Sequence, residues 1–235
     1  MKLSIIIPIY NEKETIEEII SRIEKIELKN IKKEIILIDD FSKDGTRELL
    51  KKYTKKYIVL FHPKNKGKGS AIKTGLKEAT GDIILIQDAD LEYSPEDYPS
   101  LLKPILSNET SVVYGSRFMG FNLTSKFKTK STILPLHFIG NKFLSFITQL
   151  LFFSKITDME TGYKVFKKEA LNNIKLKATR FDFEPEITAK FLKKGMKIKE
   201  VPITYSPRKF DEGKKITWKD GMKALYYLLK YRFLD

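Results

Sequence analysis

With 235 residues, 42% of them hydrophobic and 31% charged, the chain has the size and composition of one globular domain, which excludes disordered and membrane-embedded classes. It has no cysteine, which excludes disulfides, thiolate metal sites and thiol catalysis. The formal net charge of +14 suits a phosphate-bearing substrate or an anionic membrane; scattered lysine pairs account for about half of the excess, and no nucleic-acid-binding motif is present.

Strands and helices are predicted to alternate through the first half of the chain. Short apolar runs predict strands at residues 3–7, 34–38, 57–61, 83–86 and 111–114. Apolar residues at helical spacing predict helices at residues 14–26, 43–53, 68–79 and 95–106. Because the strands are apolar and alternate with helices, we expect an α/β fold with a central, mostly parallel sheet covered on both faces.

Two amphipathic regions are predicted in the second half. Residues 133–153 are rich in Leu, Ile and Phe, but Pro135, Gly140 and several polar residues interrupt them, which excludes a transmembrane helix. Two short helices at a membrane interface are favoured over an internal helix pair, because lysines flank the region on both sides. Residues 218–233 predict a basic amphipathic helix that could dock on the domain, on lipid or on a partner subunit.

Two acidic side chains follow the strand predicted at residues 83–86. Asp88 and Asp90 come two and four residues after this apolar run, and open α/β sheets bind their ligands at the carboxyl ends of the strands. Two carboxylates there can hold Mg²⁺ or Mn²⁺ and leave coordination positions open for substrate phosphates. An isolated Asp-x-Asp triplet is more often a pair of solvated loop acids, so its interpretation depends on the neighbouring strand ends.

Other strand ends carry polar groups that should meet at the same edge of the sheet. The first strand is expected to stop at Pro8. The polar groups that follow the first two strands are Tyr10, Glu12, Asp39 and Asp40. Gly67-Lys68-Gly69 opens the third helix, where Lys68 could meet a phosphate, although such a triplet is usually only a turn. The convergence of these groups predicts a phosphate-binding site at this edge.

Segments along nearly the whole chain resemble those of a known family. The first half is similar to the family 2 inverting glycosyltransferases, which have an A-type nucleotide-sugar-binding fold, in PIYNE, LIDDFSKDGT, NKGKGSAIKTGL and GDIILIQDADLEYSPEDYP. The second half resembles the polyprenyl-phosphate sugar transferases typified by dolichyl-phosphate mannose synthase, in YGSR, TDMETGYKVF, FEPEITAK and KEVPITYSPR. The chain departs from the family at Phe41, which stands where glycine is usual.

The resemblance implies a nucleotide-sugar site at the strand ends. The residues implied for it are Pro8, Tyr10, Glu12, Asp39, Asp40, Lys68, Asp88, Ala89 and Lys214. The first three would hold the base and ribose, and Asp39 the base edge or the ribose. Asp88, Asp90 and Glu92 are the implied ligands of Mg²⁺ or Mn²⁺, with Glu92 at a position where the family often has glutamine.

The implied acceptor is a polyprenyl phosphate. A phosphate monoester is mostly dianionic at neutral pH, so it needs cations to hold it rather than a base to activate it. Arg117 matches the acceptor-phosphate arginine of the family, and Arg208 is the second candidate. Lys214, with the lysine after it, could close over the diphosphate. Asp158 would bind sugar hydroxyls, or would be the base if the acceptor were a hydroxyl.

The whole chain, 1–235, is predicted to be one glycosyltransferase domain. Residues 1–117 would bind the donor, residues 118–215 the acceptor, and residues 216–235 would form the last amphipathic helix. The expected reaction is metal-dependent, inverting transfer of a hexose, with mannose from GDP-mannose favoured, to dolichyl or polyprenyl phosphate.

Three alternatives to this reaction stay open at this point. They are a UDP-sugar donor, a glycan hydroxyl as acceptor, and an inactive regulatory subunit with the same fold. Because the apolar run at the amino terminus is too short for a signal peptide, we expect a cytosolic protein. It would associate peripherally with the cytosolic face of the membrane, with a small membrane-anchoring subunit as a candidate partner.

Overall fold

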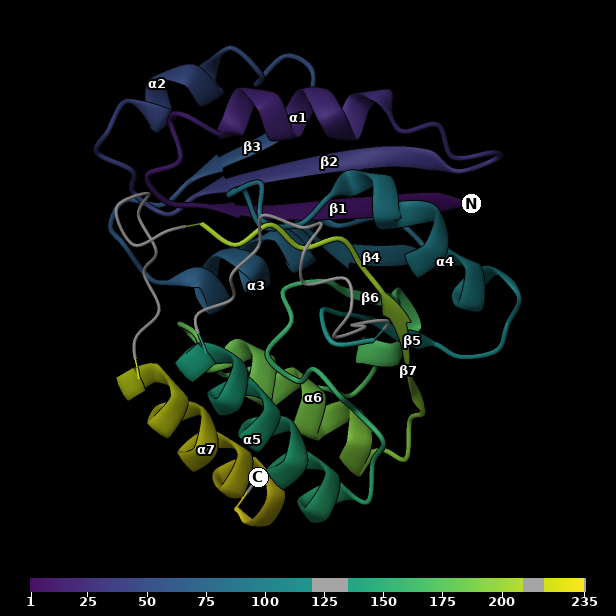
Figure 1. The fold of residues 1–235 in the computed structure, drawn as a ribbon. Helices are drawn as coiled ribbons and strands as arrows, with labels where there is room; N and C mark the ends of the chain where they lie inside the picture. Colours follow the sequence, from purple (N-terminus) through teal and green to yellow (C-terminus); the bar gives the residue numbers. More distant parts are fainter. Residues whose placement is uncertain (120–134, 209–217, 235) are drawn as a thin grey trace.

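The computed structural model of the chain describes residues 1–119, 135–208 and 218–234, with the side chains of 135–137 and 218–220 left out. In these residues, seven strands form one sheet in the order β3-β2-β1-β4-β6-β5-β7 (Figure 1). The strands are β1 (Lys2–Ile9), β2 (Lys32–Asp39), β3 (Ile58–Phe61), β4 (Ile83–Ile86), β5 (Val112–Ser116), β6 (Lys164–Lys167) and β7 (Ile198–Pro202). The α-helices are α1 (Ile16–Lys25), α2 (Thr46–Lys51), α3 (Lys68–Glu78), α4 (Tyr98–Leu106), α5 (Pro135–Phe152), α6 (Phe183–Lys193) and α7 (Trp218–Phe233).

The sheet is mostly parallel, as predicted. β1 pairs in parallel with β2 and β4, β2 with β3, and β5 with β7. β6 runs antiparallel to both of its neighbours, β4 and β5. The sequence interpretation did not assign β6, β7 or α6 as elements, although it used motifs that lie on them.

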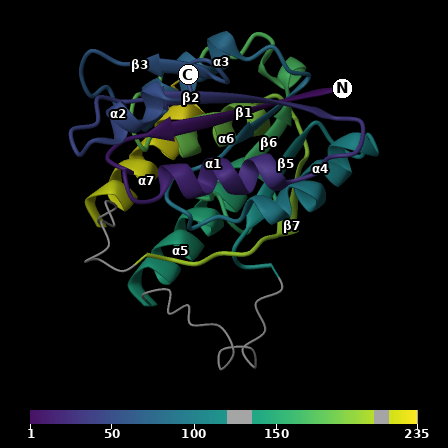
Figure 2. The same ribbon diagram turned by 90° about the horizontal axis from the view of Figure 1, so that it is seen from above.

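Helices cover both faces of the sheet, because side chains of each strand alternate between the faces. On one face, α1 and α4 pack over strand residues such as Ile5 and Ile7. On the other face, α3 and α6 pack over residues such as Ile6 and Ile36. Figures 1 and 2 show α1 on the opposite side of β1 and β2 from α3 and α6. The strands are therefore buried on both faces, which explains their continuous apolar runs.

α5 and α7 form a further layer outside α6 (Figure 1). Their contact is a small core of Leu144, Ala224 and Leu228 with two residues that follow α5, Ile156 and Met159. No helix in the described residues is both long enough and apolar enough to span a membrane.

The prediction of two short helices at 133–153 is wrong, because α5 is one continuous helix. Pro135 is its first residue, where a missing N–H costs nothing. Gly140 lies inside α5 with open space around the position of a Cβ atom, so it costs only its low helix propensity, about 1 kcal/mol.

Pro8 does not end the first strand, which continues to Ile9. The ladder between β1 and β4 stops at Ile6, whose carbonyl accepts the N–H of Gln87 at 3.0 Å. Pro8 comes two residues after Ile6, so its backbone nitrogen is on the same edge of β1 as the Ile6 carbonyl. At that point β4 has ended, so the ladder does not require an N–H from residue 8. The strand therefore tolerates this proline, and the turn begins two residues later than predicted.

Candidate active site

The acids that follow β4 lie beside a buried lysine. Lys68, the first residue of α3, has its Nζ 2.8 Å from Asp88 Oδ1 and 3.0 Å from Glu184 Oε1. Burial disfavours the charged lysine, but the two carboxylates outweigh burial and raise the pKa of Lys68 well above its ordinary value. The Gly67-Lys68-Gly69 turn therefore lies at the same edge as the acids after β4, where Lys68 forms an ion pair with Asp88; its contact with a phosphate stays a prediction.

Asp90 stands in a strongly negative environment. Its burial and the nearby carboxylates of Asp88 and Glu92 raise the pKa of Asp90 to about 7, and Arg208 only partly opposes them. The Arg208 Nη2 atom lies 3.3 Å from Asp90 Oδ2. A cation at this position lowers the free energy of the ionised acid.

Residues after β7 connect Asp90 to the first strand end. Arg208 binds both carboxylate oxygens of Glu12, with Nη1 and Nη2 each 3.0 Å from an oxygen. Glu92 Oε1 accepts the backbone N–H of Arg208, and Glu92 Oε2 accepts the hydroxyl of Tyr205, both at 2.9 Å. The segment 205–208 is thereby held against the strand-end acids.

The predicted metal ligands Asp88, Asp90 and Glu92 already have partners within the chain. Within the described residues, no group of three or more Asp, Glu or His side chains is arranged to hold a metal ion. Both Glu92 oxygens accept hydrogen bonds, but a carboxylate oxygen can accept more than one, so Glu92 stays a predicted third ligand. Asp88 and Asp90 fit a divalent cation, because repulsion between their carboxylates would be relieved by a cation between them.

The two acids at the end of β2 contact residues at the start of α2 and α3. Asp39 is fully buried, and its Oδ2 lies 3.0 Å from Arg47 Nε. Asp40 accepts the backbone N–H groups of Lys66 and Gly67, at 2.8 and 2.7 Å, and thus fixes the start of α3. Asp40 therefore positions Lys68, which is a role that the sequence did not assign to it.

Phe41 is the position at which the chain departs from the family that it resembles. Its φ of 68° is in the left-handed region that favours glycine. Lys43 and Arg47 lie over its ring, each 5.6 Å from the centroid. These cation–π contacts help to offset the backbone cost of a bulky residue in this conformation.

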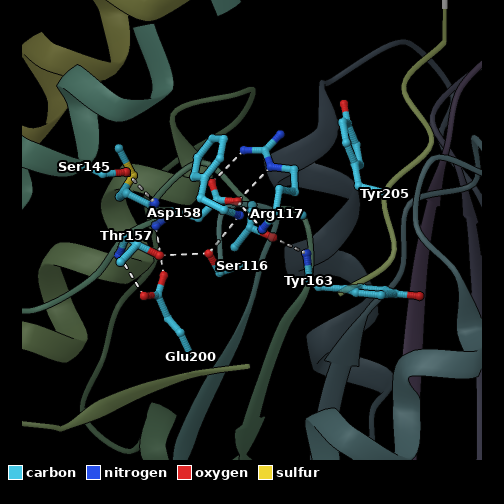
Figure 3. A network of polar contacts seen from close by, with 12 residues as sticks. Ser116, Arg117, Ser145, Thr157, Asp158, Tyr163, Glu200 and Tyr205 are labelled. Atoms are coloured by element: carbon cyan, nitrogen blue, oxygen red, sulfur yellow. Dashed lines mark hydrogen bonds and ion pairs between the residues drawn. The ribbon is translucent and has the colours of Figure 1, made fainter. Parts of the chain in front are cut away.

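The two remaining catalytic candidates form one buried pair. The Arg117 side chain donates to both oxygens of Asp158, from Nε at 2.8 Å and from Nη2 at 2.7 Å (Figure 3). The Arg117 backbone N–H also donates to Asp158, at 3.0 Å. Burial opposes the charge of Arg117, but Asp158 raises the pKa of Arg117 well above its ordinary value.

A second layer of polar contacts fixes the Arg117–Asp158 pair (Figure 3). Glu200 of β7 accepts the backbone N–H groups of Thr157 and Asp158, at 2.7 and 2.8 Å. Thr157 Oγ1 lies 2.8 Å from Ser116 Oγ, at the end of β5. The loop that carries Asp158 is therefore tied to both β5 and β7.

The sequence interpretation missed a group of charged residues on and near this loop. Lys164 is buried and donates to the carbonyl oxygens of Met159 and Thr161, each at 2.9 Å. Burial lowers the pKa of Lys164 to about 8. Burial, together with the charge of Glu184, raises the pKa of Glu160 to about 8. Glu160 could have been noticed, since it lies two residues after Asp158 in the quoted motif.

Gly162 brings the same loop against Asp88, the first acid after β4. A Cβ atom at residue 162 would be 2.2 Å from Asp88 Oδ2. The Gly162 N–H donates to the hydroxyl of Tyr93 at 3.0 Å.

The other predicted donor-site residues differ in position. Tyr10 is half-buried next to Glu12, whereas Ala89 is buried in the core beneath α1 and α4, so its side chain faces away from a ligand. Lys214 lies outside the described residues.

Residues 4–175 match the family described as Glycosyl transferase family 2. A dolichol-phosphate mannosyltransferase from Pyrococcus furiosus is 33% identical over 98% of this chain, which spans 64% of that relative. A UDP-N-acetylglucosamine--dolichyl-phosphate N-acetylglucosaminyltransferase from Methanococcus voltae is 32% identical over 96% of this chain and 94% of its own length.

The fold has solved counterparts as well. Glucosyl-3-phosphoglycerate synthase from Mycobacterium tuberculosis, in a complex with Mn²⁺, uridine diphosphate and glucosyl-3-phosphoglycerate, superposes with a TM-score of 0.74 at 19% identity, over 100% of this chain and 81% of that one. This likeness concerns the fold, which is the A-type glycosyltransferase fold. Because the family match covers most of the chain and a relative is 33% identical, the chain belongs to glycosyl transferase family 2.

Proposed function

We propose that the chain transfers a hexose from a nucleotide sugar to a polyprenyl phosphate. The observation that carries this proposal is the meeting of strand-end acids with cations from the second half of the chain, with Arg208 Nη2 3.3 Å from Asp90 Oδ2. A reaction between two phosphate-bearing substrates needs cations to offset their charge. The names of the two relatives from Pyrococcus furiosus and Methanococcus voltae support a dolichyl-phosphate acceptor.

The state of Asp158 favours a lipid phosphate over a hydroxyl acceptor. Both Asp158 oxygens accept hydrogen bonds from Arg117, so this carboxylate is already engaged in holding the guanidinium. A hydroxyl acceptor would need Asp158 as a base, whereas a dianionic phosphate needs none. Arg117 and Arg208 would orient the lipid phosphate, and direct attack by that phosphate would invert the sugar.

On the donor side, Asp88 and Asp90 would hold the divalent cation. When bound, the cation would neutralise charge on the departing nucleoside diphosphate. Lys68 would add a second positive charge beside Asp88, and Asp40 would keep Lys68 in place by fixing the start of α3. Tyr10, Glu12 and Asp39 are proposed for the nucleoside.

Two donors are candidates. Transfer of mannose is favoured by the name of the Pyrococcus furiosus relative, and GDP-mannose is the mannose donor that we propose. A UDP-sugar is the second candidate, because the Methanococcus voltae relative is named for one at nearly the same identity, and the Mycobacterium tuberculosis structure contains uridine diphosphate.

Exposed apolar side chains on two helices support peripheral attachment to a membrane, for which we propose the cytosolic face. In and directly after α5 they are Ile139, Phe143, Phe146, Leu150 and Phe153. On α7 they are Met222, Tyr226, Leu229 and Phe233. Spacings of three and four residues place each set on one side of its helix, and apolar patches of this kind usually contact a partner or lipid. The separate membrane-anchoring subunit has no support from these observations and stays a prediction.

The test is incubation of the purified chain with labelled GDP-mannose, UDP-glucose or UDP-N-acetylglucosamine, together with Mn²⁺ and a short-chain polyprenyl phosphate. We expect label in the organic extract with one donor, and none with Asp90→Asn. Absence of labelled lipid with every donor, from protein that binds nucleotide, would overturn the proposal. Activity only toward glycan acceptors would replace the lipid phosphate with a hydroxyl.

A further inference from the structure

Two glutamates near the donor-side acids each have a buried oxygen without a hydrogen-bond donor. Glu184 Oε1 pairs with Lys68, but Glu184 Oε2 accepts no hydrogen bond from the residues that the structure describes. Among those same residues, nothing donates to Glu160 Oε1 either. A buried carboxylate oxygen without a donor raises the free energy of the folded state. The arrangement therefore indicates a donor from outside the residues that the structure describes.

Both glutamates lie against the proposed donor site. Lys68 Nζ connects Glu184 to Asp88, at 3.0 and 2.8 Å. Gly162, two residues after Glu160, is in direct contact with the Asp88 carboxylate.

Glu160 also borders the proposed acceptor side. It follows Asp158 by two residues, and Asp158 holds Arg117. The charges of Glu184 and Arg117 both act on Glu160, so the two glutamates lie near both the acids proposed for the donor diphosphate and the cation proposed for the acceptor. In the proposed reaction the sugar moves from the first of these groups to the second.

Lys164 fixes the position of Glu160. Its Nζ donates to the carbonyl oxygens of Met159 and Thr161, the residues on either side of Glu160. The loop is thus held by a buried cation rather than by contacts of the Glu160 side chain, which leaves that carboxylate available. Glu160 is only partly buried as a residue, although its Oε1 atom is buried, and Glu184 lies deeper.

We propose that Glu160 and Glu184 bind the donor sugar by accepting hydrogen bonds from its ring hydroxyls. This inference rests on the proposed function. A carboxyl oxygen that carries no proton accepts hydrogen bonds whether or not the other oxygen of the group is protonated, and the hydroxyls of a hexose are donors of suitable number and size. A deoxy sugar would leave a carboxylate oxygen unpaired, so the two glutamates would select for hexoses with the full set of hydroxyls.

The test compares calorimetric binding of nucleotide sugars with that of the nucleoside diphosphates, in the presence of Mn²⁺. The proteins are the wild type, Glu160→Gln and Glu184→Gln. Each substitution keeps the side-chain shape but replaces one acceptor with an amide donor. We expect Glu160→Gln to weaken binding of the nucleotide sugar about tenfold or more, and binding of UDP or GDP by less than about twofold. Glu184→Gln should weaken binding of the nucleotide sugar at least as much.

Glu186→Gln is the matched control on the same helix. Glu186 is buried like Glu184, but it accepts the backbone N–H groups of Lys177 and Ala178 and so has its donors within the chain. This variant should lower the melting temperature and leave the ratio of the two affinities unchanged.

The outcomes separate the two proposals. If the wild type binds no nucleotide, the proposed function fails and the sugar inference fails with it. If the wild type binds nucleotide sugars, and Glu160→Gln weakens nucleotide sugar and nucleoside diphosphate equally or not at all, the sugar inference alone is overturned. A wild type that binds 2-deoxy and complete hexose donors equally well would also overturn it.

Discussion

Gly162 and Asp88 are in direct contact, and the contact leaves no room for a side chain at residue 162. A Cβ atom there would be 2.2 Å from Asp88 Oδ2. The hydroxyl of Tyr93 holds the Gly162 N–H at 3.0 Å, so the loop cannot easily move away. The acid that follows β4 and the loop that precedes β6 therefore have to move together.

Gly162→Ala is expected to displace the Asp88 carboxylate. A displacement of about 1 Å at a reacting site can lower turnover about 100-fold. Turnover of the nucleotide sugar, measured as labelled lipid, checks this. Gly140→Ala is the control, because its Cβ would meet open space on α5, and it should keep full activity. Normal turnover of Gly162→Ala would show that the position of Asp88 does not matter.

Asp158→Ala is expected to destabilise the protein strongly. It leaves the buried guanidinium of Arg117 without its partner, and breaking a buried ion pair in this way costs about 3–5 kcal/mol of unfolding free energy. Urea denaturation monitored by circular dichroism measures the change.

The double variant Arg117→Met with Asp158→Leu separates charge from packing. Because it removes both charges, it should lose less stability than Asp158→Ala alone. It should also have no transferase activity, since the proposed acceptor cation is gone. A double variant that is as unstable as the single one would argue that packing, not an unpaired charge, determines the effect.

The pKa of Glu160 predicts a dependence of stability on pH. This pKa is about 8 in the folded protein and 4.5 ordinarily. Between these values the folded state keeps a proton that the unfolded state has released, so the free energy of unfolding falls as pH rises from about 4.5 to about 8. Glu160→Gln removes this contribution and should lose less stability than the wild type between pH 5 and pH 8.

Urea denaturation at several pH values measures these slopes. Glu14→Gln, at an exposed position, is the control and should keep the slope of the wild type. If the free energy of unfolding of Glu160→Gln changed with pH as steeply as that of the wild type, Glu160 would not have a raised pKa in the folded protein.

Exposed phenylalanines on α5 are expected to bind lipid. Phe143 and Phe146 are 51% and 53% exposed, so replacing either with serine should change stability by less than about 0.5 kcal/mol. Each substitution should weaken binding to vesicles of anionic phospholipid about tenfold, because it removes a large apolar group from the contact. Co-sedimentation with vesicles measures this.

Leu106→Ser provides the comparison for the α5 variants. Leu106 is an exposed apolar residue at the end of α4, on a different part of the fold, and its loss should not affect vesicle binding. Equal loss of binding in all three variants would indicate a nonspecific effect of surface hydrophobicity.

The grouping of acids at the strand ends could be predicted from sequence, because these acids lie close to strands that are visible as apolar runs. Asp39, Asp40, Asp88 and Asp90 each lie within four residues of the end of a predicted strand, and the parallel sheet brings these ends together. The backbone conformation at Phe41 also follows from local sequence, since it is the left-handed conformation expected where the family has glycine.

The second half of the site depends on contacts between distant residues. Arg117 and Asp158 are 41 positions apart, and nothing local indicates that each satisfies the other. Glu92 matches a family metal ligand by position, yet its oxygens accept hydrogen bonds from Tyr205 and Arg208, more than a hundred positions away. Burial and pairing of this kind arise only when the sheet has assembled, so a strand-end pattern cannot predict them.

The reversed direction of β6 has a consequence for how such a protein can diversify. Its amino-terminal end lies at the same edge as the carboxyl ends of β4 and β5, so the loop at 158–163 enters the site, whereas a parallel strand would place that loop at the opposite edge. Loops tolerate replacement better than the strands that carry them. We therefore expect substitutions in this loop to alter which sugar or acceptor is used, while the parallel strands β1 to β4 continue to hold the nucleotide.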